Sequence, residues 1–198
     1  FTFKDYVEAL NDFSESSTYK EDKDYWMEQI SLIPPAPMLP LQKDPSVIRK
    51  PQFARIEKVI PKSEWNVLQK EAKKKGITTS TLLCTAYALV LGYWSNQPEL
   101  TINVTVFTRY PFNEGVTDIV GDFTSVILLR VNLLGRSDFW KLASEIQNQL
   151  MDALEHRHYD GMNVIRKIAE QAEMKEQAVM PVVFTSLLFS MEEGDIVT

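Results

Sequence analysis

Two short apolar runs of this sequence carry polar side chains that a buried strand does not need. The first run opens with Asp122 and Thr124 and continues into residues 125–129, and the second ends its Val-Val-Phe run with Thr185 and Ser186. An unpartnered polar group costs about 1–3 kcal/mol when it is buried in a protein. Hydroxyls donate and accept hydrogen bonds and a carboxylate accepts protons, so these side chains need either partners or a chemical role.

Other common catalytic sites find little support. The two histidines, His156 and His158, would point away from each other on a helix, and no third His or cysteine cluster completes a metal site, so a surface or hinge role fits them better. There is no Gly-x-Ser-x-Gly elbow, and no base lies near Thr185 in the sequence. The seven glycines are scattered, so a phosphate-binding loop is not predicted either.

Composition narrows the class of protein. The chain has 198 residues, of which 44% are hydrophobic, enough for the core of one ordinary domain. A net charge of −6 argues against nucleic-acid binding, and the basic residues 73–75 fit a helix end that Gly76 stops. The single cysteine, Cys84, lies in an apolar run and is expected to be a small buried residue.

The sequence also bears on location. No stretch approaches the roughly 20 apolar residues of a membrane span, and no basic region followed by an apolar one stands at the N-terminus. We therefore expect a soluble, cytoplasmic protein that does not contact a membrane. The chain begins at Phe1 and not at Met, which indicates a piece of something longer.

Hydrophobic periodicity predicts helices that alternate with strands. The expected helices lie within residues 1–30 and at 62–75, 79–94, 139–154 and about 161–173, and the expected strands lie at 53–60, 100–107, 120–133 and 180–189. Ser137 is the expected N-cap of the helix that follows it, and the helix from Thr79 to Trp94 is apolar on nearly every face, so it should be central and buried. The pattern predicts an α/β lobe with a mixed sheet packed with helices.

A proline-rich stretch separates the first helices from the rest. Prolines at 34, 35, 37, 40, 45 and 51 favour an extended path. Met38, Leu39 and Leu41 are too apolar for a solvated linker, so we favour a strap over a surface, with an interdomain linker as the alternative. The predicted division is residues 1–52, helical segment and strap, and residues 53–198, the main lobe.

Four segments, in their order and spacing, resemble the heterocyclization domains of nonribosomal peptide synthetases, a branch of the condensation-domain family. They are Pro-Ala-Pro-Met-Leu-Pro-Leu at 35–41, the run from Thr-Ser-Thr-Leu at 79 to 94, Gly-Asp-Phe-Thr at 121–124, and Pro-Val-Val-Phe-Thr-Ser at 181–186. His-Arg-His-Tyr-Asp-Gly at 156–161 and Asn-Val-Thr-Val-Phe at 103–107 also look like that branch. The resemblance runs through almost the whole chain and implies a lobe similar to chloramphenicol acetyltransferase.

The resemblance implies a reaction between two thioesters held on 4'-phosphopantetheine of peptidyl carrier proteins. The amine of a tethered Cys, Ser or Thr attacks the upstream thioester, its side chain then attacks the new amide carbonyl, and loss of water gives a thiazoline or oxazoline. The lobe itself is expected to bind no cofactor. Its expected partners are carrier domains, a neighbouring adenylation domain and the missing N-terminal lobe.

In this reaction the amide oxygen must be protonated and lost, which requires hydrogen-bond donors about 3 Å from it. The resemblance points most strongly at Thr185, whose hydroxyl both donates and accepts and whose β-branch limits rotation. Asp122 could accept a proton or orient a hydroxyl, with Thr124 on the same strand face, whereas Ser186 would face away from Thr185. The alternative is that Asp122 and Thr124 only bond neighbouring backbone where the chain bends.

The chain departs from the family in ways that bear on activity. The first lobe of the family carries Asp-x-x-x-x-Asp, in place of the His-His-x-x-x-Asp-Gly of amide-forming relatives, and neither pattern occurs here. A further family aspartate follows Phe-Thr-Ser, but Asp195 does not stand in a matching context. What remains looks like the second lobe with the tail of the first. We therefore expect no cyclodehydration from this polypeptide alone.

Two other functions remain open from the sequence. One is an ordinary amide-forming condensation domain, although Asp-Phe-Thr at 122–124 and Phe-Thr-Ser at 184–186 favour the cyclizing branch. The other is a noncatalytic module that docks carrier proteins or a neighbouring domain. An exposed apolar face where the first lobe would sit is expected for both the truncated enzyme and the docking module.

Overall fold

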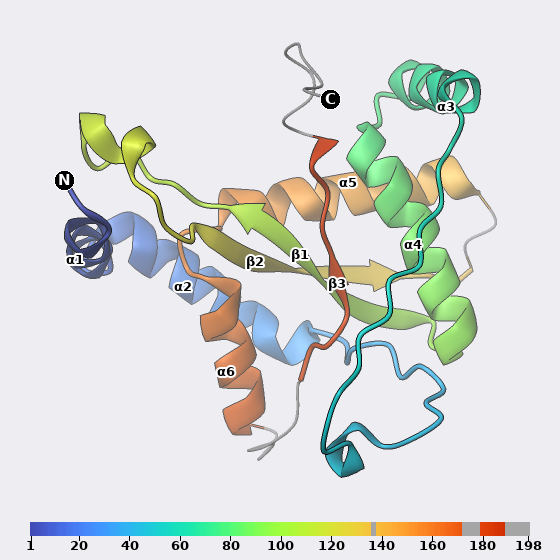
Figure 1. The fold of residues 1–198 in the computed structure, drawn as a ribbon, viewed down its shortest axis with the longest axis horizontal. Coiled ribbons are helices and arrows are strands. Elements are labelled where there is room, and N and C mark those ends of the chain that lie inside the picture. Colours follow the sequence, from blue (N-terminus) through green and yellow to red (C-terminus); the bar gives the residue numbers. More distant parts are fainter. Residues whose placement is uncertain (136–137, 172–178, 189–198) are drawn as a thin grey trace.

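The computed structural model describes residues 1–135, 138–171 and 179–188, in which helices surround a small sheet (Figure 1). The elements are, in chain order, α1 (Phe3–Phe13), α2 (Ser17–Gln29), η1 (Ile30–Leu32), η2 (Pro45–Val47), α3 (Lys62–Lys74), α4 (Thr79–Ser95), β1 (Glu99–Phe107), η3 (Glu114–Asp118), β2 (Thr124–Asn132), α5 (Phe139–Glu155), α6 (Gly161–Gln171) and β3 (Val183–Phe184). The η elements are short 3₁₀ helices. The two helices expected in the first thirty residues are confirmed, and each begins at a hydroxyl cap, Thr2 and Ser16.

The sheet has the order β2-β1-β3, so β1 is the central strand (Figure 1). β1 and β2 are antiparallel, and their register runs from Glu99 opposite Asn132 to Phe107 opposite Thr124. β3 is parallel to β1 and aligns Val183 with Asn103. The mixed sheet that the sequence predicts is therefore confirmed.

The side chains of β1 alternate between two unlike faces, as the two-residue period of a strand requires. Leu100 and Ile102 are fully buried in the main hydrophobic core, where they pack with residues of α4 and α5. Thr101, Asn103 and Thr105 lie on the other face. A strand with three polar residues on one face needs partners for them, and those partners define the candidate site described below.

The N-cap of α5 is Asp138 and not Ser137, which lies outside the described residues. The Asp138 carboxylate accepts hydrogen bonds from the backbone N–H groups of Trp140 and Lys141 at 2.8 and 3.3 Å. A carboxylate at this position also suits the positive end of the helix dipole. The helix then buries Leu142, Ala143, Ile146, Leu150 and Ala153 along one stripe.

α4 is not buried on every side, which corrects the sequence-based expectation. Cys84 and Ala88 face the core, but Tyr93 is 81% exposed and Val90 and Trp94 are exposed as well. Apolar residues occupy all faces of this helix, whereas the sheet covers only one of them. The expected burial of Cys84 is confirmed: it is 1% exposed, and burial raises the pKa of its thiol to about 12.

In the described part of the chain, no single helix is long and apolar enough to cross a bilayer. α3 and α4 reach the required length and composition only as a pair, and that pair is bent by 100°.

Residues 53–60 do not form the strand that their alternation predicts. Phe53 is 95% exposed, Ile56 98% and Val59 83%, and the segment follows an extended path from η2 to α3 (Figure 1). None of the three strands among the described residues pairs with it. An alternating pattern marks a segment that can be a strand, but a strand also needs a neighbour for its backbone hydrogen bonds.

The other strand boundaries also differ from the prediction. β2 begins at Thr124 and not near residue 120, because residues 114–118 form η3 and the chain turns before the ladder starts. β3 spans two residues within the expected 180–189, of which Phe189 lies outside the described part of the chain.

The proline-rich stretch, which we call the strap, is bonded to β1 at its start. The Thr101 side chain and backbone N–H donate to the carbonyls of Pro34 and Pro35 at 2.6 and 3.1 Å, which ties the stretch to β1. Leu39 packs against the core, but Met38 and Leu41 are exposed, so those two residues do not explain the attachment. The division between residues 52 and 53 stays a prediction.

α6 approaches β2 closely because it begins at a glycine. A Cβ at Gly161 would lie 2.2 Å from the backbone oxygen of Val126, a distance that only backbone movement could relieve. We expect Gly161→Ala to lower the free energy of unfolding by about 1–3 kcal/mol, seen as a lower midpoint in thermal unfolding.

The matched control is Gly115→Ala, where the nearest atom would be a side-chain oxygen at an ordinary 3.5 Å. This variant should stay within about 0.5 kcal/mol of the parent. Equal midpoints for the two variants would contradict the close packing of α6 on β2.

Candidate functional site

Thr185 lies directly after β3 and extends the parallel register, so that it is beside Thr105 of β1. The two Oγ1 atoms are 2.8 Å apart, and either can be the donor. Thr185 is exposed and Thr105 is half-buried. The Thr185 hydroxyl is therefore not sealed in the core, and among the described residues its bond is to a side chain and not to the main chain, so it stays open to a ligand.

Thr124 lies on the same face of the sheet. It is the antiparallel partner of Phe107, and Thr105 is the partner of Val126, so Thr124 and Thr105 are diagonal neighbours. Such neighbours are about 7–8 Å apart. The structure thus brings three hydroxyls, from Thr124, Thr105 and Thr185, into one row across the three strands, which we call the hydroxyl row.

Asn103 lies one pair further along this face. It is 5% exposed, and its Nδ2 donates to the backbone oxygen of Met180 at 2.6 Å. Its Oδ1 is buried and has no hydrogen-bond partner among the described residues. A buried acceptor without a partner is costly, and this oxygen is enclosed and not open to the surface.

Neither Thr105 nor Asn103 was predicted from the sequence to be a site residue. The signal was present, since polar residues recur at 101, 103 and 105 in a Val-rich strand. Two-residue spacing puts such residues on one face. Their partners come from the C-terminal segment that lies beside β1, Met180 for Asn103 and Thr185 for Thr105.

Asp122 lies in the turn before β2 and is exposed. Its Oδ1 accepts a hydrogen bond from the backbone N–H of Thr124 at 2.9 Å. Hydrogen bonds with the side chain and the backbone of Thr124 lower the pKa of Asp122 from 3.8. The alternative reading, that Asp122 bonds neighbouring backbone, therefore describes its observed contact, and its catalytic role stays a prediction.

Ser186 is not part of the hydroxyl row. It is half-buried, and its Oγ accepts a long hydrogen bond of 3.4 Å from the backbone N–H of Leu188. Exposure alternates from Val183 to Leu188, as expected if Ser186 and Thr185 point to opposite sides.

Arg109 fixes the loop that leads to Asp122. Its guanidinium group lies 4.0 Å from the centre of the Phe123 ring and 5.4 Å from that of Phe107. The same group donates to the backbone oxygens of Val116, Thr117 and Ile119, the closest at 2.7 Å. One arginine thus joins η3 to the start of β2, because cation–π contact and hydrogen bonding act together.

The histidines join the N-terminal helices to the lobe. His158 Nδ1 and its backbone N–H lie 2.9 and 2.8 Å from Oδ2 of the buried Asp22 in α2. The His156 ring stacks on Tyr25 at 3.6 Å, and the Tyr25 hydroxyl donates to Asp152 at 2.6 Å. Burial and this hydrogen bond raise the pKa of Tyr25 to about 12. In the described ranges, no group of three His, Cys, Asp or Glu residues could hold a metal ion.

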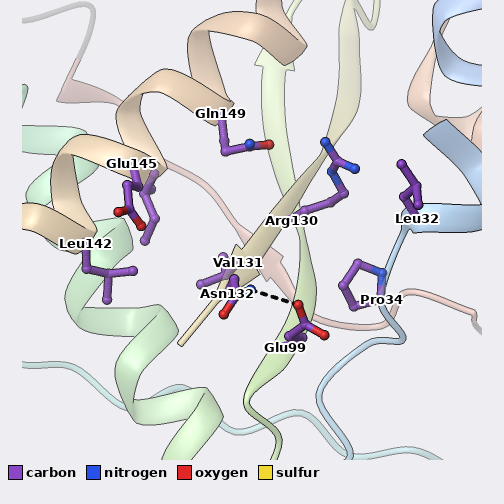
Figure 2. Close-up of a pocket in the computed structure, with 10 residues that line it drawn as sticks. Leu32, Pro34, Glu99, Arg130, Val131, Asn132, Leu142, Glu145 and Gln149 are labelled. Carbon is purple, nitrogen blue, oxygen red and sulfur yellow. Dashed lines mark hydrogen bonds between the residues drawn. The ribbon is translucent and has the colours of Figure 1, made fainter. Parts of the chain in front are cut away.

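A cavity of about 410 Å³ lies away from the hydroxyl row, between the end of β2, α5 and the residues before the strap (Figure 2). Arg130 and Gln149 extend into it, and Asn132 Nδ2 donates to Glu99 Oε1 at 2.9 Å. None of the four site residues predicted from the sequence lines this cavity. It is therefore separate from the candidate site.

The hydroxyl row has exposed apolar neighbours. Phe107 and Val183 share its sheet face and are both exposed, and Leu187 is exposed beyond them. A catalytic centre would exclude water, and this open face does not do so by itself. The arrangement has hydrogen-bonding groups on one wall and needs a second wall to enclose a substrate.

Comparison with known proteins gives a family and several relatives. The condensation-domain family model matches residues 1–194. Bacitracin synthase 1 of Bacillus licheniformis is 44% identical over 189 residues, which are 95% of this chain and 4% of that protein. Phenyloxazoline synthase MbtB of Mycobacterium tuberculosis is 30% identical over 190 residues, 95% of this chain and 13% of that protein.

Among solved structures, the EpoB nonribosomal peptide synthetase cyclization-docking bidomain from Sorangium cellulosum has a TM-score of 0.83 and 35% identity. The match covers 94% of this chain and 38% of that one. The chain thus spans a small part of each relative. The fold expected from the resemblance is confirmed.

Loss of Arg109 should loosen the loop in front of Asp122. Arg109→Ala removes both cation–π contacts and leaves three carbonyls without their donor, so we expect a loss of about 2 kcal/mol in stability and faster amide exchange over residues 114–123. Arg157→Ala is the control, because Arg157 is exposed and donates to one carbonyl only. Unchanged exchange over residues 114–123 in Arg109→Ala would show that Arg109 does not hold this loop.

Asp122 should titrate below 3.8 in an NMR titration, because Thr124 stabilises its charged form. Folding lowers the pKa of Asp122, so its charged form stabilises the folded state. This contribution to the free energy of unfolding is complete above pH 3.8 and is lost as the pH falls through the lowered pKa of the folded state. Asp122→Asn keeps the acceptor for the Thr124 N–H and removes the titration. A measured pKa of Asp122 at or above 3.8 would contradict the hydrogen bond from Thr124 to its carboxylate.

Proposed function

Because this chain belongs to the condensation-domain family, we propose that it is the second lobe, with the tail of the first, of a nonribosomal peptide synthetase heterocyclization domain. The observation that carries the proposal is the exposed hydroxyl of Thr185, held at an open sheet face by a second hydroxyl. The cyclizing activity named for EpoB and the phenyloxazoline named for MbtB support this branch of the family.

The proposed reaction has two stages. First, the amine of a carrier-bound Cys, Ser or Thr attacks an upstream thioester, which forms an amide and releases the carrier thiol. Next, the S–H or O–H of the same residue adds across the amide C=O, so that the carbonyl oxygen becomes a hydroxyl on the new ring. That hydroxyl leaves with the proton of the amide nitrogen as water, and a C=N bond forms in the thiazoline or oxazoline.

Thr185 is the residue proposed to act on the departing oxygen. Its hydroxyl donates a hydrogen bond that stabilises negative charge as the C–O bond breaks, which is the role of a preorganised donor. Thr124 and Asp122 lie at the other end of the face, where Asp122 holds the turn and is charged near neutral pH. Ser186, on the opposite side, supports the segment through Leu188.

The proposed partners follow from the substrates. Both acyl groups arrive on 4'-phosphopantetheine of peptidyl carrier domains, and a neighbouring adenylation domain supplies the amino acid. The lobe needs no cofactor of its own for this reaction, since its steps are additions and proton transfers. The exposed Phe107 and Val183 are proposed to meet the first lobe, which closes the site over the hydroxyl row.

The experiment compares this chain with a complete module. Both carriers are loaded, and the products of the full domain and of the isolated chain are separated by mass spectrometry. We expect the full domain to give a product lighter than the linear amide by one water, and the isolated chain to give neither product, because it lacks the wall that excludes water.

Each other outcome is informative. Product from the isolated chain would overturn the expected inactivity. A full domain that stops at the linear amide would favour an amide-forming condensation domain. Carrier binding without turnover in the full domain would favour the docking module.

A further inference from the structure

In the hydrogen bond between Thr105 and Thr185, either hydroxyl can be the donor. Each hydroxyl has one proton to donate and two lone pairs to accept with. If Thr185 gives its proton to Thr105, it has none for a substrate oxygen. If Thr105 is the donor, the Thr185 proton is free and points away from the pair.

We propose that Thr105 is a positioning residue for cyclodehydration, which donates its hydroxyl proton to Thr185 Oγ1 and so leaves the Thr185 proton for the departing oxygen. This proposal rests on the proposed function and assigns it a further residue. Thr105 does not touch the substrate in it and acts only through Thr185.

The strands favour Thr105 as the fixed member of the pair. Thr105 lies inside β1, opposite Val126 of β2, so its backbone belongs to a continuous ladder. Thr185 is the first residue beyond the short β3, where the pairing with β1 ends. β-branching limits χ1 of both residues, so a stiff hydroxyl on a paired strand orients one on an unpaired segment.

A hydrogen bond in this direction also makes the Thr185 hydroxyl a stronger donor to the substrate. A hydroxyl that accepts a hydrogen bond becomes a better donor, because chains of hydrogen bonds polarise one another. As the ring C–O bond breaks, the leaving oxygen gains negative charge, and the Thr185 proton stabilises it. Thr105 keeps its own proton throughout, and the water leaves with one proton from the nucleophile and one from the amide nitrogen.

The test uses the complete module with both carriers loaded, under single-turnover conditions. The rates of linear amide formation and of water loss are measured separately by mass spectrometry. Thr105→Val keeps the branched shape and removes the hydroxyl, and Thr105→Ser keeps the hydroxyl. We expect Thr105→Val to slow water loss about tenfold, as expected for one lost hydrogen bond, with amide formation within about twofold of the parent.

The matched variants separate positioning from folding. Thr105→Ser should restore water loss to within about threefold of the parent, and thermal unfolding checks that each variant is folded. Thr105→Ala is the second hydroxyl-free variant should Thr105→Val unfold. The double variant of Thr105→Val with Thr185→Val should be no slower than Thr185→Val alone, because Thr105 acts only through Thr185.

The contrary outcomes are distinct. Unchanged or faster water loss in folded Thr105→Val would mean that Thr185 is the donor, and would overturn the proposal while the parent still cyclizes. A double variant slower than Thr185→Val would show that Thr105 acts independently, which also overturns it. A parent module that forms no ring contradicts the proposed function itself, and this proposal falls with it.

Discussion

The site depends on one constraint, that β1 is paired along both edges. β2 pairs with the whole of one edge, and the other edge bonds the strap and the segment before β3, through the Thr101 N–H to Pro35 and the Asn103 N–H to Val182 at 3.1 and 3.0 Å. A strand held on both sides cannot rotate, so its apolar side chains enter the core and its polar ones lie on the other face, where Thr101 and Asn103 are buried and Thr105 is half-buried. The position of the Thr105 hydroxyl follows from that pairing.

A second set of contacts joins the N-terminal helices to this sheet. Trp26 is buried in the main core, and its Nε1 donates to the backbone oxygen of His156 at 2.8 Å. Asp22 accepts from His158 close by. Both buried polar groups have partners, because the His156 carbonyl accepts from Trp26 and His158 bonds Asp22. α2 therefore shares the main core with the lobe that follows the strap, whereas Tyr6 of α1 packs in a separate cluster with Val116, Ile119 and Phe123.

Local patterns predicted those features that depend on local forces. Periodicity predicts α5 and the burial of Cys84, because a helix face and an apolar run describe their own surroundings. The same reasoning failed for Phe53 and its neighbours, since a strand depends on a partner far along the chain. Thr105 was missed for a related reason: its partner, Thr185, follows 80 residues later. The role of Asp122 was left open, because a turn and a catalytic site use the same residue types.

The burial of Cys84 determines how its thiol reacts with alkylating reagents. It is the sole sulfhydryl among 198 residues, and its high pKa and its burial on the inner face of α4 keep it from forming the thiolate that alkylating reagents attack. A thiol reagent would therefore spare the folded polypeptide. Labelling of this one side chain would then report how often α4 detaches from the sheet.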